Sequence, residues 1–287
     1  MKNFALGKYV PYADWVHRLD PRVKIFTTIL LMVTVFLPFD SWGMRFLMEG
    51  IVFLVATFLV FSSHVRLLSL LKSLRSLWFM VVFLLLIYIL VPNNSHVLGI
   101  AWSINGWTVY WDAFAEAGRI LLRIFLMIEL TMVLTASTKP LDLTYALEWY
   151  LSPLKVFHFP AAAVAMTISI ALRFIPTLLE DADRVMKAQS SRGVDFAHGP
   201  LIRRLAGYTS LIIPLFVSSF LRSGELANAM ECRGYDPSAK RTRYRMLKFH
   251  WGDLFYTLFS AALLTGFILV SVFHYDVFAQ WFGVYVP

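Results

Sequence analysis

Long apolar runs with almost no charged side chains constrain this chain more than any other feature. About 20 apolar residues suffice for a helix to cross the hydrocarbon core of a bilayer, and several runs approach that length. Of the 287 residues, 59% are hydrophobic and 15% are charged, whereas soluble domains carry about 25% charged residues. The sequence therefore predicts an all-α, polytopic membrane protein.

About five spanning helices are expected. The predicted spans are Val23–Phe39, Phe46–Ser62, Leu77–Val91, Arg119–Ala136 and Leu254–His274. Ahead of the first span, Asp20 and Pro21 are typical of a helix N-cap followed by the first helical residue. The N-terminal segment has no apolar core region after its lysines, so it is not predicted to be a signal peptide.

The distribution of positive charge predicts the orientation. The net charge of +8 could suggest nucleic acid, but an excess of Lys and Arg in a membrane protein first of all marks the cytoplasmic side. Basic residues precede the first predicted span, whereas the loop Pro92–Gly118 and the tail Tyr275–Pro287 have none. The N-terminus is therefore predicted to be cytoplasmic, and the loop and the tail external.

More than half of the 26 Lys and Arg residues lie between 137 and 250. This region also contains two apolar stretches, Ala161–Leu179 and Tyr208–Leu221. If both spanned, the basic chain between them would be external, against the positive-inside rule. We therefore predict long helices at the cytoplasmic face and three regions: a membrane domain 1–136, a coupling-helix region 137–250, and a final span with an external tail, 251–287. The alternative is a seven-span bundle.

A polar signature, A-x-x-x-R-G-x-D, occurs twice in this basic region. The matching residues are Ala188, Arg192, Gly193 and Asp195 in the first copy, and Ala229, Arg233, Gly234 and Asp236 in the second. Glycine accepts the left-handed conformation that closes a helix, and a cation just before the stop is favoured by the helix dipole. Alanine one turn earlier leaves room for another surface to approach. Two equivalent helix ends predict a dimeric or pseudo-dimeric partner.

The other candidates for chemistry are ionisable residues inside the apolar runs. Glu129 is the most provocative of them, because an intramembrane carboxylate is a functional candidate by default. Arg119 and Arg123 are expected to pair within the bundle, with Glu116 or Glu129. The histidine spacing predicts no metal site, and the single Cys232 excludes an internal disulfide.

Four segments resemble the transmembrane T component of energy-coupling factor transporters, which import vitamins and metals into bacteria and archaea. They are Ser191–Gly193, Cys232–Gly234, the sequence HRLDPRVK at His17–Lys24, and TKPLDLTYALEWYLSPLK at Thr138–Lys155. Members of that family usually have alanine before each arginine, where this chain has the small residues Ser191 and Cys232.

The resemblance implies a non-enzymatic subunit in a prokaryotic cell membrane, without a cofactor. Its partners would be two ATP-binding-cassette ATPases and an integral-membrane, substrate-specific S component. The implied ATPase-binding residues are Ala188, Ser191, Arg192, Gly193, Ala229, Cys232, Arg233 and Gly234. The implied S-component contacts are Leu143, Leu147, Met166, Ile170, Phe174, Leu215 and Phe216. Hydrolysis would belong to the partners, since this chain has no G-x-x-x-x-G-K-[ST] motif.

Two other function classes are kept as alternatives. One is a polytopic membrane enzyme that uses Glu129 and buried arginines on a lipid-linked or phosphorylated substrate. The other is a stand-alone channel or secondary transporter.

Overall fold

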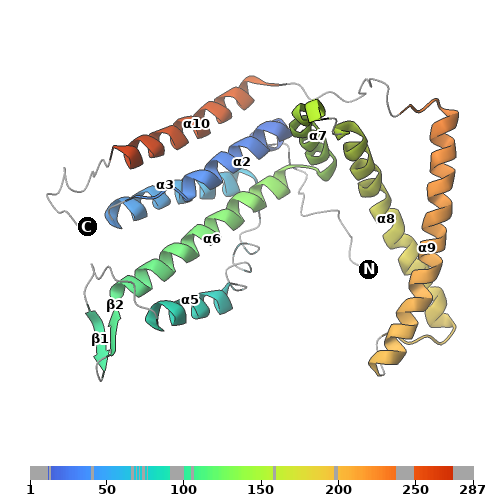
Figure 1. The fold of residues 1–287 in the computed structure, drawn as a ribbon, viewed down its shortest axis with the longest axis horizontal. Coiled ribbons are helices and arrows are strands. Elements are labelled where there is room, and N and C mark those ends of the chain that lie inside the picture. The colour runs from blue at the N-terminus through green and yellow to red at the C-terminus, as the bar shows by residue number, and fades with distance from the viewer. Residues whose placement is uncertain are drawn as a thin grey trace. The chain divides into compact units, whose positions relative to one another are not determined.

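The computed structural model describes residues 12, 14–39, 42–65, 68, 70, 72, 75, 77–90, 100–104, 107–157, 160–196, 200–236 and 249–273. Figure 1 shows its helices and one short hairpin. The elements are α1 (Trp15–Arg18), α2 (Pro21–Val35), α3 (Trp42–Ser62), α5 (Trp78–Leu90), β1 (Ile100–Ile104), β2 (Trp107–Tyr110), α6 (Trp111–Ser137), α7 (Pro140–Leu151), the 3-10 helix η1 (Ser152–Phe157), α8 (Ala161–Ser191), α9 (Leu201–Cys232) and α10 (Trp251–Val272).

The helices divide into two compact units. One unit, here called the membrane unit, contains α1 to α6 together with α10, and the other, here called the coupling unit, contains α7, α8 and α9. The boundary that follows α6 lies between Lys139 and Pro140. In the sequence, the coupling unit is therefore an insertion between α6 and α10.

Within the membrane unit, α2 begins and ends where local chemistry requires. The Asp20 side chain accepts a hydrogen bond from the backbone N–H of Arg22 at 2.9 Å, and Pro21 is the first helical residue, which confirms the predicted cap. The helix ends at Val35, earlier than the predicted Phe39. Pro38 explains the difference, because the residue before a proline is pushed out of the helical conformation.

Helices α2 and α10 run side by side in the same direction. Their starts are joined by a hydrogen bond from the backbone N–H of Asp20 to Asp253, and their ends by one from Ser271 to the backbone carbonyl of Pro38. Helices α3 and α6 also run together, since Arg123 of α6 binds Glu49 of α3. Helix α2 runs opposite to α6, because Lys24 near the start of α2 binds the backbone carbonyl of Ser137 at the end of α6.

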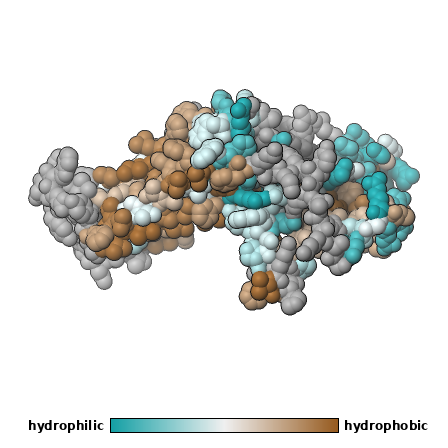
Figure 2. All heavy atoms as spheres, turned by 90° about the horizontal axis from the view of Figure 1, so that it is seen from above, coloured by the Kyte–Doolittle hydropathy of each residue, from teal (hydrophilic) through white to brown (hydrophobic). Residues whose placement is uncertain are grey.

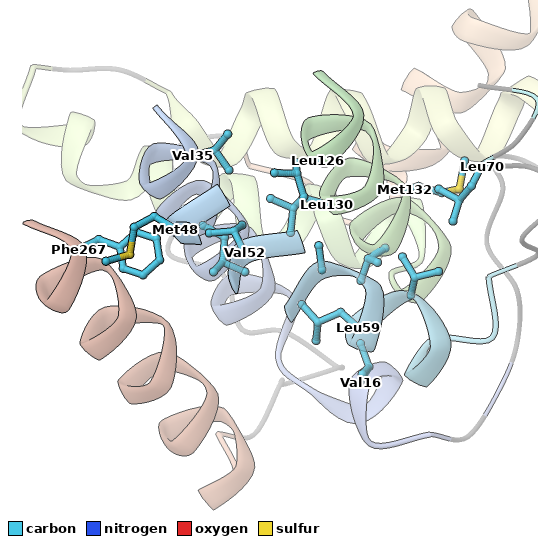
Figure 3. Close-up of a cluster of buried hydrophobic side chains, with 14 of the residues drawn as sticks. Val16, Val35, Met48, Val52, Leu59, Leu70, Leu126, Leu130, Met132 and Phe267 are labelled. Carbon is cyan, nitrogen blue, oxygen red and sulfur yellow. The ribbon is translucent and has the colours of Figure 1, made fainter. Parts of the chain in front are cut away.

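The apolar core of the membrane unit lies among α2, α3 and α6. Figure 3 shows Val52, Leu126 and Leu130 pointing toward one another between these helices. Leu126, Val60 and Ala56 are fully buried. Ring contact between Phe39 and Phe267, with centroids 6.1 Å apart, extends the cluster to α10.

The outward faces of the membrane unit are apolar as well. Phe255 and Val272 of α10 and Phe79 of α5 are each at least 65% exposed, and Figure 2 shows brown, hydrophobic surface over this part of the molecule. A helix that is apolar on all sides is suited to a lipid surrounding. The structure thereby confirms the predicted all-α, polytopic membrane protein.

The helices that are long and apolar enough to cross a bilayer are not the five expected from the sequence. Among the described residues, these segments are Gly43–Ser62, Ala113–Ser137, Ala161–Ser191, Arg204–Cys232 and Trp251–Val272. Three overlap predicted spans. The other two lie in α8 and α9, whose first halves are apolar enough to cross a bilayer. Helices α2 and α5, with 15 and 13 residues, are too short to belong to this set.

The segment Pro92–Gly118, predicted to be an external loop, contains a hairpin and the start of α6. Strands β1 and β2 pair antiparallel, with Ile104 opposite Trp107. Helix α6 begins at Trp111 rather than at the predicted Arg119. Its first turns are rich in alanine but include polar residues, so they favour a helix without forming an apolar run.

In the coupling unit, α7 begins at Pro140, which suits the first position of a helix, and is followed by η1. Pro160 precedes the first residue of α8. Pro176 and Pro214 lie inside the continuous helices α8 and α9. Side-chain contacts join α8 to α9 along antiparallel directions, as the next subsection describes.

Candidate functional site

The first arginine lies at the C-terminal end of α8, in a helix stop of defined geometry. The backbone N–H of Gly193 donates to Ser190 O at 3.0 Å, and that of Val194 donates to Gln189 O at 3.1 Å. Gly193 has a φ of 86°. This pair of hydrogen bonds with a left-handed glycine is the Schellman motif, and it confirms the predicted helix stop.

The second arginine lies in the same arrangement at the end of α9. The backbone N–H of Gly234 donates to Glu231 O at 2.9 Å, and that of Tyr235 donates to Met230 O at 3.0 Å. Gly234 has a φ of 69°. Arg192 and Arg233 therefore occupy the same C-cap position, with closely similar backbone angles of −87°, 7° and −91°, 12°.

The residues of both signatures are accessible to a partner. Four positions are exposed in each copy: Ala188, Ser191, Arg192 and Gly193 in the first, Ala229, Cys232, Arg233 and Gly234 in the second. Within the part of the chain that the structure describes, neither guanidinium has an ion-pair partner. Each cation thus lies beside the negative end of its helix dipole, and a planar guanidinium at such a position can bind a carboxylate or carbonyl group through two donors.

The packing of α8 against α9 sets the distance between the two arginine ends. Gly207 of α9 lies against the chain just after Arg192, since a Cβ at this glycine would come within 3.2 Å of Val194 Cγ1. Nearby, the rings of Phe196 and Tyr208 are 5.9 Å apart. Arg233 follows Gly207 along α9, and at 1.5 Å per residue this stretch measures about 39 Å. The two arginines therefore lie near opposite ends of α9.

An ion pair holds the same two helices together between those ends. Arg222 Nη2 of α9 lies 2.8 Å from Asp181 Oδ2 of α8, with both side chains largely shielded from solvent. Toward the α8–α9 connection, Gln189 Nε2 donates to Ser210 O at 3.5 Å. These contacts make α8 and α9 an antiparallel pair.

The apolar residues predicted to contact an S component differ in their accessibility. Leu147 and Phe216 are exposed, with exposed fractions of 42% and 69%. The others are half-buried: Leu143, Met166, Ile170, Phe174 and Leu215. A larger exposed apolar set lies elsewhere on α9: Leu205, Ile212, Ile213, Val217, Phe220 and Leu221. The adjacent Ile212 and Ile213 indicate this exposed apolar surface in the sequence. A helix that buries only one face usually has polar residues on the rest of its circumference, whereas neighbouring apolar residues widen the apolar face.

The charged residues of the membrane unit pair only partly as predicted. Arg119 binds Glu116 at 3.1 Å, as expected. Arg123 binds Glu49 of α3 at 2.8 Å, a partner that the sequence analysis did not single out. The expected pairing of Glu129 with these arginines is not found among the described residues. Glu129 lies farther along α6, at the level of the buried Leu126 and Leu130. Arg119 and Arg123 bind Glu116 and Glu49 instead.

Comparison with known proteins identifies relatives along nearly the whole chain. Residues 13–244 match the family model CbiQ, described as cobalt transport protein. A protein of Ruminiclostridium cellulolyticum is 37% identical over 271 residues, which cover 94% of this chain and 98% of the relative. A protein of Bacillus subtilis is 39% identical over 247 residues, covering 86% and 90%. Both are named energy-coupling factor transporter transmembrane protein EcfT.

The chain therefore belongs to the CbiQ and EcfT family, the transmembrane T components of energy-coupling factor transporters. It is a multi-pass membrane protein of bacteria. The family is one of transporter subunits, which argues against the alternative of a membrane enzyme.

Proposed function

We propose that this chain couples two ATP-binding-cassette ATPases to a substrate-binding S component during uptake of a vitamin or a metal ion. Arg192 docks in one ATPase and Arg233 in the other. When ATP draws the two ATPases together, both helix ends move with them, and the exposed apolar faces of α7 to α9 change how they hold the S component. ATP hydrolysis is carried out by the partners.

The observation that carries the proposal is the structural equivalence of the two arginine ends. Each has the same pair of cap hydrogen bonds, the same left-handed glycine and an exposed guanidinium. Their separation of about 39 Å along α9 leaves each end room for its own subunit. A duplicated contact matches a partner that itself contains two similar subunits.

The surface of α9 supports the S-component part of the proposal. Phe216, Phe220 and Leu221 are each more than 60% exposed. Contiguous apolar surface of this kind marks a contact with lipid or with another protein. Orientation follows from the charges: with the N-terminus cytoplasmic, the arginine ends lie on the side where ATP is available.

Purification with candidate ATPases tests the docking roles. Arg192→Ala and Arg233→Ala should each weaken retention of ATPase, and the double variant should lose it together with substrate uptake. Arg184→Ala removes another exposed cation of α8 about two turns before the cap and serves as the matched control, which should retain both. If the double variant kept its ATPases and its uptake at the level of the control, the proposal would be wrong.

A further inference from the structure

Three charged side chains are buried at the end of the membrane unit where α2 and α10 begin and α6 finishes. Asp253 is fully buried, Lys24 is 4% exposed and Asp20 is 6% exposed. Burying a charge is costly unless hydrogen bonds compensate it. Asp20 and Lys24 belong to the HRLDPRVK segment. The start of a helix requires only the Asp20 cap, so it does not explain why Lys24 is also buried.

Asp253 joins the start of α10 to the start of α2. Its Oδ1 accepts a hydrogen bond from the backbone N–H of Asp20 at 2.7 Å, and its Oδ2 accepts one from the backbone N–H of His250 at 2.7 Å. One carboxylate therefore fixes the chain just before α10 and ties it to the residue that caps α2. Both bonds involve backbone groups, so they fix the position of the chain itself.

Lys24 joins the end of α6 to the same turn of α2. Its ammonium donates to the backbone carbonyl of Ser137 at 2.9 Å and to that of His17 at 3.2 Å. Ser137 is the last residue of α6, and Ser137 and Thr138 are each 3% exposed. The chain is thus held where it leaves α6, with only Thr138 and Lys139 between Ser137 and the start of α7 at Pro140.

These two fixed points are the places where the chain leaves the membrane unit for the coupling unit and returns from it. In the chain, Ser137 and His250 are the anchored residues on either side of the coupling unit, so movement of α7, α8 and α9 that is passed along the backbone reaches the membrane helices at these two residues. Both points converge on one helical turn, residues Asp20 to Lys24. Apolar side chains could hold these helices together at a lower desolvation cost than buried charges. Apolar contacts are not directional, however, whereas hydrogen bonds to backbone atoms also fix the position of the chain.

We infer that Asp20, Lys24 and Asp253, here called the α2 anchor, transmit the movement of the coupling unit to the membrane helices. The inference rests on the proposed function, since the movement is that driven by the ATPases. Lys24 and Asp253 are positioning residues: they touch neither ATP nor substrate and act through the backbone at Ser137 and His250. Loss of either should uncouple the two units without releasing the ATPases.

Hydrogen exchange of the assembled complex tests this inference, with a non-hydrolysable ATP analogue and Mg²⁺ as the probe. In the unmodified complex, the nucleotide should change backbone exchange in α8 and α9 and also at the starts of α2 and α10. In Lys24→Met, which keeps the side-chain length and removes the ammonium, the change in α8 and α9 should persist and the change in α2 should fall severalfold. An α2 response equal to that of the unmodified complex would overturn the inference.

The matched control is Leu126→Ala, which opens a cavity in the core at a fully buried position and leaves the α2 anchor intact. Both variants should lower the unfolding temperature, but only Lys24→Met should lose the α2 response. An equal loss in Leu126→Ala would mean general destabilisation, and the inference would be rejected.

Measurements on the chain without partners separate the anchor from the proposed function. There, Lys24→Met should raise exchange at the start of α7, and Asp253→Asn, which replaces one acceptor oxygen by a donor, should raise it at the start of α10. Unchanged exchange in both variants would overturn the anchor whatever the partners are. Retention of ATPases by the Arg192→Ala and Arg233→Ala double variant would instead contradict the proposed function alone.

Discussion

Arg222 of α9 and Asp181 of α8 form an ion pair with 2.8 Å between Nη2 and Oδ2, located between the two arginine ends of the coupling unit. The pair joins two helices that also meet near their connection, through Gln189 and Ser210. Because it lies far from that connection, the pair constrains the angle at which α8 and α9 cross. Arg192 lies at that connection, so its distance from Arg233 is set by the length of α9, and the ion pair instead fixes how the earlier part of α8 lies against α9.

Removal of either partner of this pair should loosen the crossing. We expect Arg222→Ala and Asp181→Ala each to lower the unfolding free energy, and a double-mutant cycle to give a coupling of about 1 kcal/mol, the upper range for a partly exposed pair. Lys187→Ala is the control, since it breaks an i,i+4 pair with Asp183 within α8 itself. Additive effects of the two substitutions would show that the pair does not act as a unit.

Substitution of the two cap glycines should destabilise the helix ends without creating a clash. A Cβ at Gly193 or Gly234 would meet no atom within 4 Å, so the cost of Gly193→Ala or Gly234→Ala is that of the left-handed conformation, about 1–2 kcal/mol. Gly224→Ala is the matched control: it lies inside α9 with equally open space, and it should stabilise the helix by up to about 1 kcal/mol. Thermal unfolding of the purified protein should separate the two classes. Equal effects at Gly193 and Gly224 would contradict this assignment of the cap.

The pair between Glu49 and Arg123 should matter more to stability than pairs at the surface. Glu49 is 4% exposed, and its second oxygen has no hydrogen-bond partner among the described residues. In Arg123→Met the carboxylate would lose its buried cation, and we expect a loss of about 3 kcal/mol in unfolding free energy, measured as a lower unfolding temperature in detergent. Adding Glu49→Gln should restore most of the loss. A double variant as unstable as the single one would mean that Arg123 contributes through packing alone.

The single Cys232 provides a test of orientation without any substitution. It is exposed and lies directly before Arg233. If this helix end is cytoplasmic, a membrane-impermeant maleimide should label Cys232 in inverted vesicles and in detergent, but not in intact cells. Cys232→Ser provides the background signal. Labelling in intact cells would place the second arginine end outside and reject the proposed orientation.

Local chemistry explains which features were predictable from the sequence. The apolar runs identify a membrane protein because their length and low charge are properties of contiguous residues. The two helix stops were predictable because glycine tolerates a left-handed backbone whatever path the chain takes afterwards. The cap of α2 was predictable because Asp20 caps the helix through the N–H of Arg22, two residues away. The limits of α6 were less predictable, since its first turns are helical without being apolar.

Contacts between distant parts of the chain required the tertiary structure. Arg123 and Glu49 are 74 residues apart, Lys24 and Ser137 are 113 apart, and Asp20 and Asp253 are 233 apart. No local pattern specifies such partners, because the choice depends on which helix faces meet and at what height. By itself, the sequence determined the membrane class, the two arginine signatures and their helix stops. Only the packing of helices decided that Glu49 receives Arg123, that Glu129 is left in the core, and that the chain is fixed on both sides of the coupling unit by a single turn of α2.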